Sequence, residues 1–144
     1  MRCQFFSCVI FLFIASRVNC QSSNVYRLSD AVTPSFYDLS IQHELSTFNG
    51  TVTIDFYVNR ATSVIEMHSY GLTINGKASV KSFDTTESES TYILFANETE
   101  KVTIGLDRTL AAKSNHSITL SFRGRLSDDM KGLYSSSYYN GNVK

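Results

Sequence analysis

Apolar and polar side chains alternate along much of the chain after residue 36. The alternation is clearest over 37–45 and 51–58, where apolar or aromatic residues hold nearly every second position. A period of two with β-branched and aromatic residues is typical of strands that bury one face. We therefore expect two strands, with buried faces formed by Tyr37, Leu39, Ile41 and Leu45 and by Val52, Ile54, Phe56 and Val58.

Shorter stretches of the same kind continue along the chain and predict an all-β fold. They cover 64–69, 72–74, 78–80, 91–96, 101–106 and 117–123. Asn-Gly favours tight turns because both residues tolerate a positive φ, so we expect turns at Thr47–Gly50 and at Asn75-Gly76. Asp84–Ser90 is acidic and polar, as expected of a loop. Short strands at this spacing indicate an antiparallel β-sandwich or a strongly curved, saddle-like sheet.

The start of the chain has the composition of a secretory signal peptide. Arg2 is followed by the apolar run Phe5–Ala15, and Val18 and Cys20 suit the −3 and −1 positions of a cleavage site. We predict a signal peptide over residues 1–20 and one domain over residues 21–144. An uncleaved signal-anchor is the alternative, although a membrane span needs roughly 20 apolar residues and this run is shorter.

Removal of that signal changes both the cysteine count and the charge of the chain. Cys3, Cys8 and Cys20 all lie within it, so the mature domain must be stable without disulfides. Without Arg2 and Arg17, 11 basic residues face 13 acidic ones, a net charge of −2. This balance gives no reason to expect a nucleic-acid partner. Membrane attachment is expected only if the signal is retained or a longer isoform is anchored.

One segment begins like a zinc-binding motif but does not complete it. His43-Glu44-Leu45-Ser46-Thr47 starts as His-Glu-x-x-His, which requires two histidines four residues apart on a helix. The fifth residue here is Thr47 and the local pattern is that of a strand. We therefore expect His43 to be a solvent-facing strand residue and no metal to bind there.

The remaining candidates for catalysis are also weak. His68 is expected to pack or hydrogen-bond within the sheet, and His116 to be exposed. The chain has no Gly-x-Ser-x-Gly elbow and no phosphate-binding loop. Asp128 and Asp129 lie in a polar turn and are expected to be solvated rather than catalytic. We therefore predict no catalytic residue and no cofactor in this chain.

Three N-glycosylation sequons lie beyond the signal peptide. They are Asn49-Gly50-Thr51, Asn97-Glu98-Thr99 and Asn115-His116-Ser117. Each falls at a break between predicted strands, where a bulky glycan is tolerated. For a secreted chain we expect at least one of Asn49, Asn97 and Asn115 to carry a glycan.

Phe48-Asn49-Gly50, Phe122–Leu126 and Gly132–Tyr138 belong to a series of short motifs between Tyr26 and Tyr138. Together these motifs resemble the N-terminal β-domain of the M1 zinc aminopeptidases, an aminopeptidase N-like domain. The early matches are Arg27-Leu28, Pro34, Tyr37-Asp38-Leu39, Phe48-Asn49-Gly50 and 64–68, a strand that ends in His. The late matches are Phe122–Leu126 and Gly132–Tyr138. The chain departs from the family pattern at Ser29, where proline is usual, and at 114–116.

The resemblance implies packing roles for several of these residues. Gly50 and Gly124 are expected at turns, where the missing Cβ helps. Phe48, Phe122 and Tyr134 are expected to bury large apolar areas against the sheet. Full-length members bind zinc through motifs of a second domain, which the N-terminal domain caps. This chain reaches Lys144 without those motifs, so the resemblance transfers no catalytic residue to it.

Two roles are consistent with the sequence. The chain is either the N-terminal domain of a secreted or cell-surface aminopeptidase, present as a fragment or short isoform, or a stand-alone secreted glycoprotein that binds a protein or acts as a decoy. A domain that covers a catalytic partner should expose a contiguous apolar patch. Tyr134, Tyr138 and Tyr139 are the candidates for that surface.

Overall fold

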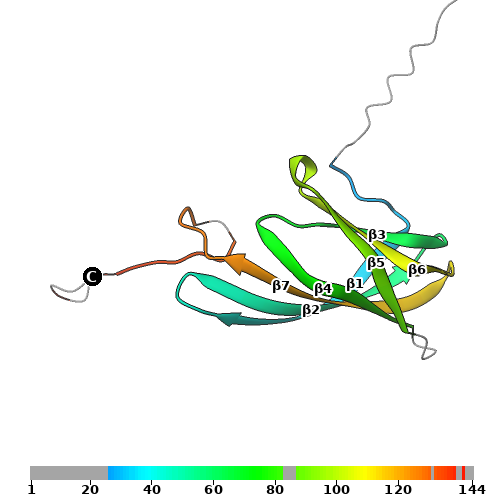
Figure 1. Cartoon of the computed structure of the whole chain (residues 1–144), viewed down its shortest axis with the longest axis horizontal. Coiled ribbons are helices and arrows are strands. Elements are labelled where there is room, and N and C mark those ends of the chain that lie inside the picture. Colours follow the sequence, from blue (N-terminus) through cyan, green and yellow to red (C-terminus); the bar gives the residue numbers. More distant parts are fainter. Residues whose placement is uncertain (1–25, 83–86, 131, 139–140, 142–144) are drawn as a thin grey trace, which may run out of the picture.

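The alternating stretches form seven antiparallel strands, which curve into one saddle-like sheet (Figure 1). A computed structural model describes residues 26–82, 87–130, 132–138 and 141, so the predicted signal peptide lies outside the described residues. The strands are β1 (Val32–His43), β2 (Thr47–Val58), β3 (Thr62–His68), β4 (Leu72–Ser82), β5 (Glu87–Ala96), β6 (Lys101–Leu110) and β7 (Ser114–Arg125). The all-β prediction is confirmed. Within the described ranges the helical structure is one 3₁₀ turn, Asn97–Thr99, and no helix there could span a membrane.

The strand order β1-β2-β7-β4-β5-β6-β3 folds the sheet into two layers. β5 belongs to both layers, because its start pairs with β4 and its remainder pairs with β6. The layer β5-β6-β3 therefore curls over one face of β2-β7-β4, which we call the inner face; the opposite face is the outer face. The predicted curved, sandwich-like sheet is thus the observed one.

The core lies between the two layers. Its largest fully buried side chains come from β2, β4, β6 and β7, and are Val58, Val80, Val102, Ile104 and Ile118. Alternate residues of a strand point to the same face, and residues directly opposite one another on paired antiparallel strands share that face. The apolar residues of neighbouring strands therefore meet in one core. Phe56, Ile65, Ala78, Leu106, Leu110 and Leu120 complete that core.

Two phenylalanines and two glycines form reciprocal pairs across β2 and β7. Phe48 lies opposite Gly124, and Gly50 lies opposite Phe122. A Cβ atom on Gly50 would lie 2.4 Å from Cζ of Phe122, and one on Gly124 would lie 2.3 Å from Cζ of Phe48. The prediction that these glycines occupy turns is therefore wrong: they make room for aromatic rings within strands. The predicted burial of Phe48 and Phe122 is confirmed.

The positions of the predicted turns also need correction. Thr47–Gly50 belongs to β2, and the hairpin turns instead at 44–46, where the Glu44 N–H donates to the Thr47 carbonyl at 2.7 Å. Asn75-Gly76 lies inside β4 at a bulge, with Gly76 at φ +69°. The predicted loop Asp84–Ser90 is wrong from Glu87 onward, where β5 begins; residues 84–86 lie outside the described residues.

Candidate partner-binding surface

The inner face of β1 carries three apolar side chains that remain exposed. Tyr37, Leu39 and Ile41, which we call the β1 stripe, are 57%, 55% and 38% exposed. The expectation that this strand buries one face is therefore wrong within the domain itself. Leu45, expected on the same face, lies in the hairpin turn and is fully exposed.

The position of β1 in the sheet explains this exposure. Among the described residues, β1 is an edge strand that pairs only with β2, and the layer β5-β6-β3 curls over the strands on the other side of β2. Leu39 lies opposite Val52, and Tyr37 opposite Ile54. Val52 and Ile54 are partly buried against the core. The β1 stripe thus extends the core's apolar surface into solvent as one contiguous face, and such a face marks an interaction surface.

The predicted tyrosine surface lies elsewhere, in the segment that follows β7. Figure 1 shows this segment, coloured orange to red, leading away from the sheet. The Ser127 N–H donates to the Leu133 carbonyl at 2.8 Å, and the Ser135 N–H donates to the Ser127 carbonyl at 3.1 Å. Tyr134 and Tyr138 are exposed, so the expected burial of Tyr134 is wrong. Tyr139 lies outside the described residues, and the predicted partner surface at these tyrosines stays a prediction.

The three histidines differ in their exposure to solvent, and two of them differ from what the sequence predicts. His43 ends β1 and is exposed, and His68 is exposed at the end of β3, so the prediction that His68 packs within the sheet is wrong. His116, expected at the surface, is buried: it stacks on Phe56 with ring centroids 5.8 Å apart and lies 2.8 Å from the Ser114 hydroxyl. It also lines an inner hollow of about 220 Å³ near Arg108.

The described residues do not fit a metal centre. No group of three or more His, Cys, Asp or Glu side chains gathers within the described ranges. The segment that begins like a zinc motif forms the end of β1 and the hairpin turn, where Thr47 donates a hydrogen bond from its hydroxyl to the Glu44 carboxylate at 3.2 Å. Asp128 and Asp129 are exposed, as expected of a solvated turn.

The three sequons occupy different structural settings. Asn97 begins the exposed 3₁₀ turn between β5 and β6, and Asn115 is an exposed residue at the start of β7. Asn49 is half-buried within β2, so the prediction of a break between strands is confirmed for Asn97 but is wrong for Asn49 and Asn115. Whether any of the three carries a glycan stays a prediction.

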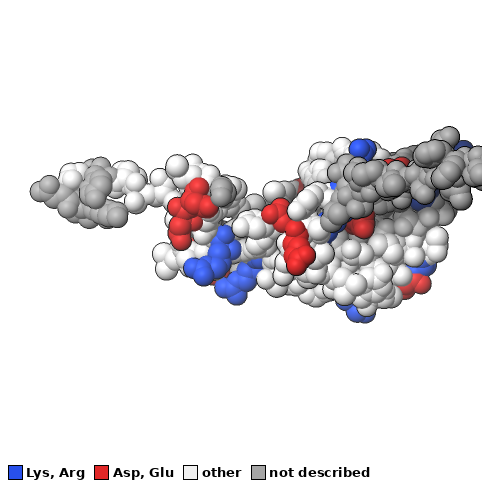
Figure 2. Space-filling view, turned by 90° about the horizontal axis from the view of Figure 1, so that it is seen from above, with Lys and Arg blue, Asp and Glu red and all other residues white. Residues whose placement is uncertain are grey.

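Charged side chains are dispersed over the surface. In the view of Figure 2, lysines and arginines lie near aspartates and glutamates, with broad uncharged areas between the groups. Exposed ion pairs follow the same mixed pattern, including Lys77 with Glu89 at 2.9 Å and Lys81 with Glu87 at 3.0 Å. The face seen in Figure 2 therefore has no extended patch of one sign, and apolar contact is the stronger basis for recognition.

These features define an all-β domain with a closed core at one side and an open apolar edge at the other. The chain belongs to the peptidase M1 N-terminal domain family, which it matches over residues 33–144. It is 29% identical to aminopeptidase N of Oryctolagus cuniculus over 133 residues, which cover 84% of this chain and 14% of that protein.

Other relatives cover a similar share of this chain. Endoplasmic reticulum aminopeptidase 1 of Rattus norvegicus is 31% identical over 119 residues, covering 80% of this chain and 13% of that protein. Aminopeptidase N of Homo sapiens is 27% identical over 138 residues, covering 84% and 14%. The chain thus spans about 14% of the length of such relatives, and it corresponds to the N-terminal domain of a metallo-aminopeptidase family.

Proposed function

We propose that this chain serves as the non-catalytic N-terminal domain of a secreted or cell-surface metallo-aminopeptidase that removes N-terminal residues from peptides. In this proposal the β1 stripe packs against the remainder of that protein, which supplies the zinc and the peptidase chemistry. The chain's own contribution is structural: it covers an apolar surface of its partner and supports the walls around the active site.

The observation that carries the proposal is the exposed β1 stripe in a domain of this family. Leu39 is 55% exposed although it lies opposite Val52, which packs against the core. Covering such side chains stabilises an interface by about 25 cal/mol for each Å² of apolar area removed from water. A protein several times longer than this chain, like the relatives, supplies the surface needed to cover it.

The first test identifies the native product. Transcripts from this locus are sequenced past the Lys144 codon, and the protein is isolated from expressing cells with an antibody against the exposed segment 132–138. We expect a product several times the mass of this chain, with aminopeptidase activity that a zinc chelator removes. A product of the chain's own mass without that activity contradicts the proposal and favours a stand-alone secreted binding module or decoy.

The second test examines the surface in that longer protein. Leu39→Glu places a charge on the inner face of β1, whereas Ser40→Glu places the same charge on the outer face, one residue away. We expect Leu39→Glu to lower the thermal stability of the longer protein and Ser40→Glu to leave it nearly unchanged. In the chain alone, both substitutions should change the unfolding free energy by less than about 1 kcal/mol, because neither position is buried there. Equal effects of the two substitutions in the longer protein would contradict the assignment of the β1 stripe.

A further inference from the structure

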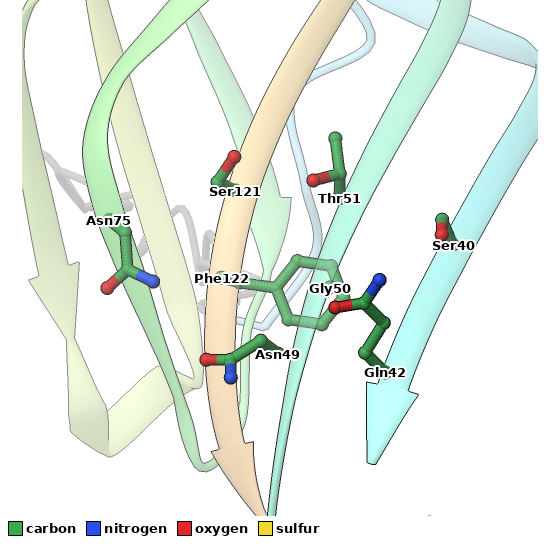
Figure 3. Close-up of a pocket in the computed structure, with 8 residues that line it drawn as sticks. All are labelled: Ser40, Gln42, Asn49, Gly50, Thr51, Asn75, Ser121 and Phe122. Carbon is green, nitrogen blue, oxygen red and sulfur yellow. The ribbon is translucent and has the colours of Figure 1, made fainter.

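The outer face of the sheet holds a polar hollow of about 280 Å³, on the side of β1 opposite the β1 stripe. Four neighbouring strands contribute to it: β1, β2, β7 and β4. Figure 3 shows their side chains around the hollow, with Gln42 reaching from β1 toward β2. Its lining is Ser40, Gln42, Asn49, Gly50, Thr51, Asn75, Ser121 and Phe122.

The chemistry of this lining favours an uncharged, polyhydroxylated ligand. Amides and hydroxyls both donate and accept hydrogen bonds, and none of the lining residues is charged. The volume is slightly below the roughly 300–1,000 Å³ typical of pockets for drug-sized ligands, which suits one sugar ring. Arg123 lies directly across from Asn49 on β7, on the same outer face. Sugar hydroxyls and an acetamido group match these donors and acceptors.

The hollow contains its own attachment point for a sugar. Asn49 is the acceptor of the sequon Asn49-Gly50-Thr51, and Thr51, two residues on, lies on the same outer face. Asn49 is half-buried, and within the described residues its side-chain amide takes part in no hydrogen bond. Because Asn49 lines the hollow, a sugar bonded to its amide nitrogen begins there.

We propose that this hollow is the seat of an N-acetylhexosamine, the first sugar of a glycan attached to Asn49. The donor is a lipid-linked oligosaccharide diphosphate. The sugar C1 forms a bond to the Asn49 amide nitrogen while its bond to the diphosphate oxygen breaks, and the amide proton is released. The inference rests on the part of the proposed function that brings this chain into the secretory lumen.

The other two sequons provide an internal comparison. Asn97 and Asn115 are exposed, and neither lines either of the two hollows described. Their glycans are expected to extend into solvent. The Asn49 glycan should instead be held at its first sugar by Gln42 from one side and Asn75 from the other, which orders it and shields its bond to Asn49.

The experiment uses the unaltered full chain, secreted from cultured cells, and follows each site separately by peptide mass spectrometry. A peptide:N-glycanase, which hydrolyses the bond between the Asn side chain and the first sugar, is applied to native and to denatured protein. We expect release at Asn49 to be about tenfold slower than at Asn97 and Asn115 in the native protein, as the loss of one or two hydrogen bonds implies. In denatured protein the three rates should converge.

Variants then test whether the side chains of the hollow hold the first sugar. The double variant Gln42→Ala with Asn75→Ala should bring release at Asn49 close to the rate at the other sites. Thr73→Ala is the matched control: Thr73 lies on the outer face of β4, two residues before Asn75, and outside the lining. It should leave the slow release unchanged.

The outcomes separate the inference from the proposed function. Glycans at Asn97 or Asn115 with none at Asn49 overturn the inference alone, and so does release at Asn49 as fast as at the other sites. Failure of the cells to secrete the chain shows that it does not enter the lumen, which overturns both the secretory part of the proposed function and this inference. A secreted chain with no glycan at any of the three sites overturns this inference alone.

Discussion

β1 and β7 have similar alternating sequences but opposite environments. Along β7, residues such as Ile118 and Leu120 on the inner face are buried, while Ser121 and Arg123 on the outer face are exposed. Along β1 the same alternation gives no fully buried residue. The difference lies in position: β7 pairs on both sides and is covered by the second layer, whereas β1 is an uncovered edge. Alternation therefore identifies the two faces of a strand, and the neighbours of the strand determine which face is covered.

The largest expected effect tests this contrast in stability. Ile118→Ala removes a side chain that is 1% exposed and should lower the unfolding free energy of the chain by about 2–5 kcal/mol, through lost burial and a residual cavity. Leu39→Ala on β1 should lower it by less than about 1 kcal/mol. Urea unfolding followed by circular dichroism measures both. Equal losses would show that β1 packs against something within the isolated chain.

An intermediate effect is expected at the reciprocal Phe–Gly pairs. Gly124→Ala places a methyl group against the Phe48 ring and should destabilise the chain by about 1–3 kcal/mol through overpacking. The control Gly71→Ala meets no atoms within 4 Å and should lose about 1 kcal/mol, from its positive φ alone. Phe48→Leu should recover part of the loss in the Gly124→Ala background but none in the Gly71→Ala background. Equal recovery in both backgrounds would show that the ring contact is not the cause.

The smallest effect concerns the carboxylate of Asp107, which lies on β6. A hydrogen bond from the Ser88 hydroxyl holds the pKa of Asp107 below its ordinary value of 3.8, with help from Arg108. Because the folded-state pKa is the lower one, the carboxylate stabilises the fold above pH 3.8. That contribution disappears as the pH falls through the folded-state pKa.

Asp107→Asn should therefore slightly lower the stability of the chain near neutral pH and flatten its loss of stability in acid. Thermal unfolding between pH 2 and pH 7 measures the profile. Ser88→Ala removes the donor and should flatten the profile in the same way. An unchanged profile for both variants would show that other carboxylates govern the acid unfolding of this domain.

The alternating pattern predicted the location of most strands, but it did not predict how far each strand is buried or where it begins and ends. Thr47–Gly50 reads as a turn because Asn-Gly favours one, yet Gly50 serves to admit the Phe122 ring between paired strands. That requirement comes from Phe122 on β7, which is distant in the sequence, and it leaves no local signal. For the same reason the sequence gives no sign of the polar hollow around Asn49, which forms only when four strands align.

The same reasoning explains the error at His116. The sequence predicts a strand from Ser117, whereas β7 begins at Ser114. The added residues bring His116 opposite Phe56 on the inner face, where the two rings stack. A shift of strand end by three residues therefore changes a predicted surface residue into a buried one. The exposure of the β1 stripe has a different cause: alternation predicts a buried face, but burial also requires a covering layer, which β1 lacks among the described residues.

The central position of β7 has a consequence for the order in which the domain forms. β7 is the last strand in the chain, yet it pairs with both β2 and β4, and Thr47 meets Arg125 across the first of these pairings. Pairings between distant residues form slowly because the intervening loop must close first. During synthesis, β2 can pair with β1, but the edge of β2 that faces β7 stays unpaired until residue 125 has emerged. Asn49 is presented to modifying enzymes throughout that interval, before the sheet that surrounds it exists.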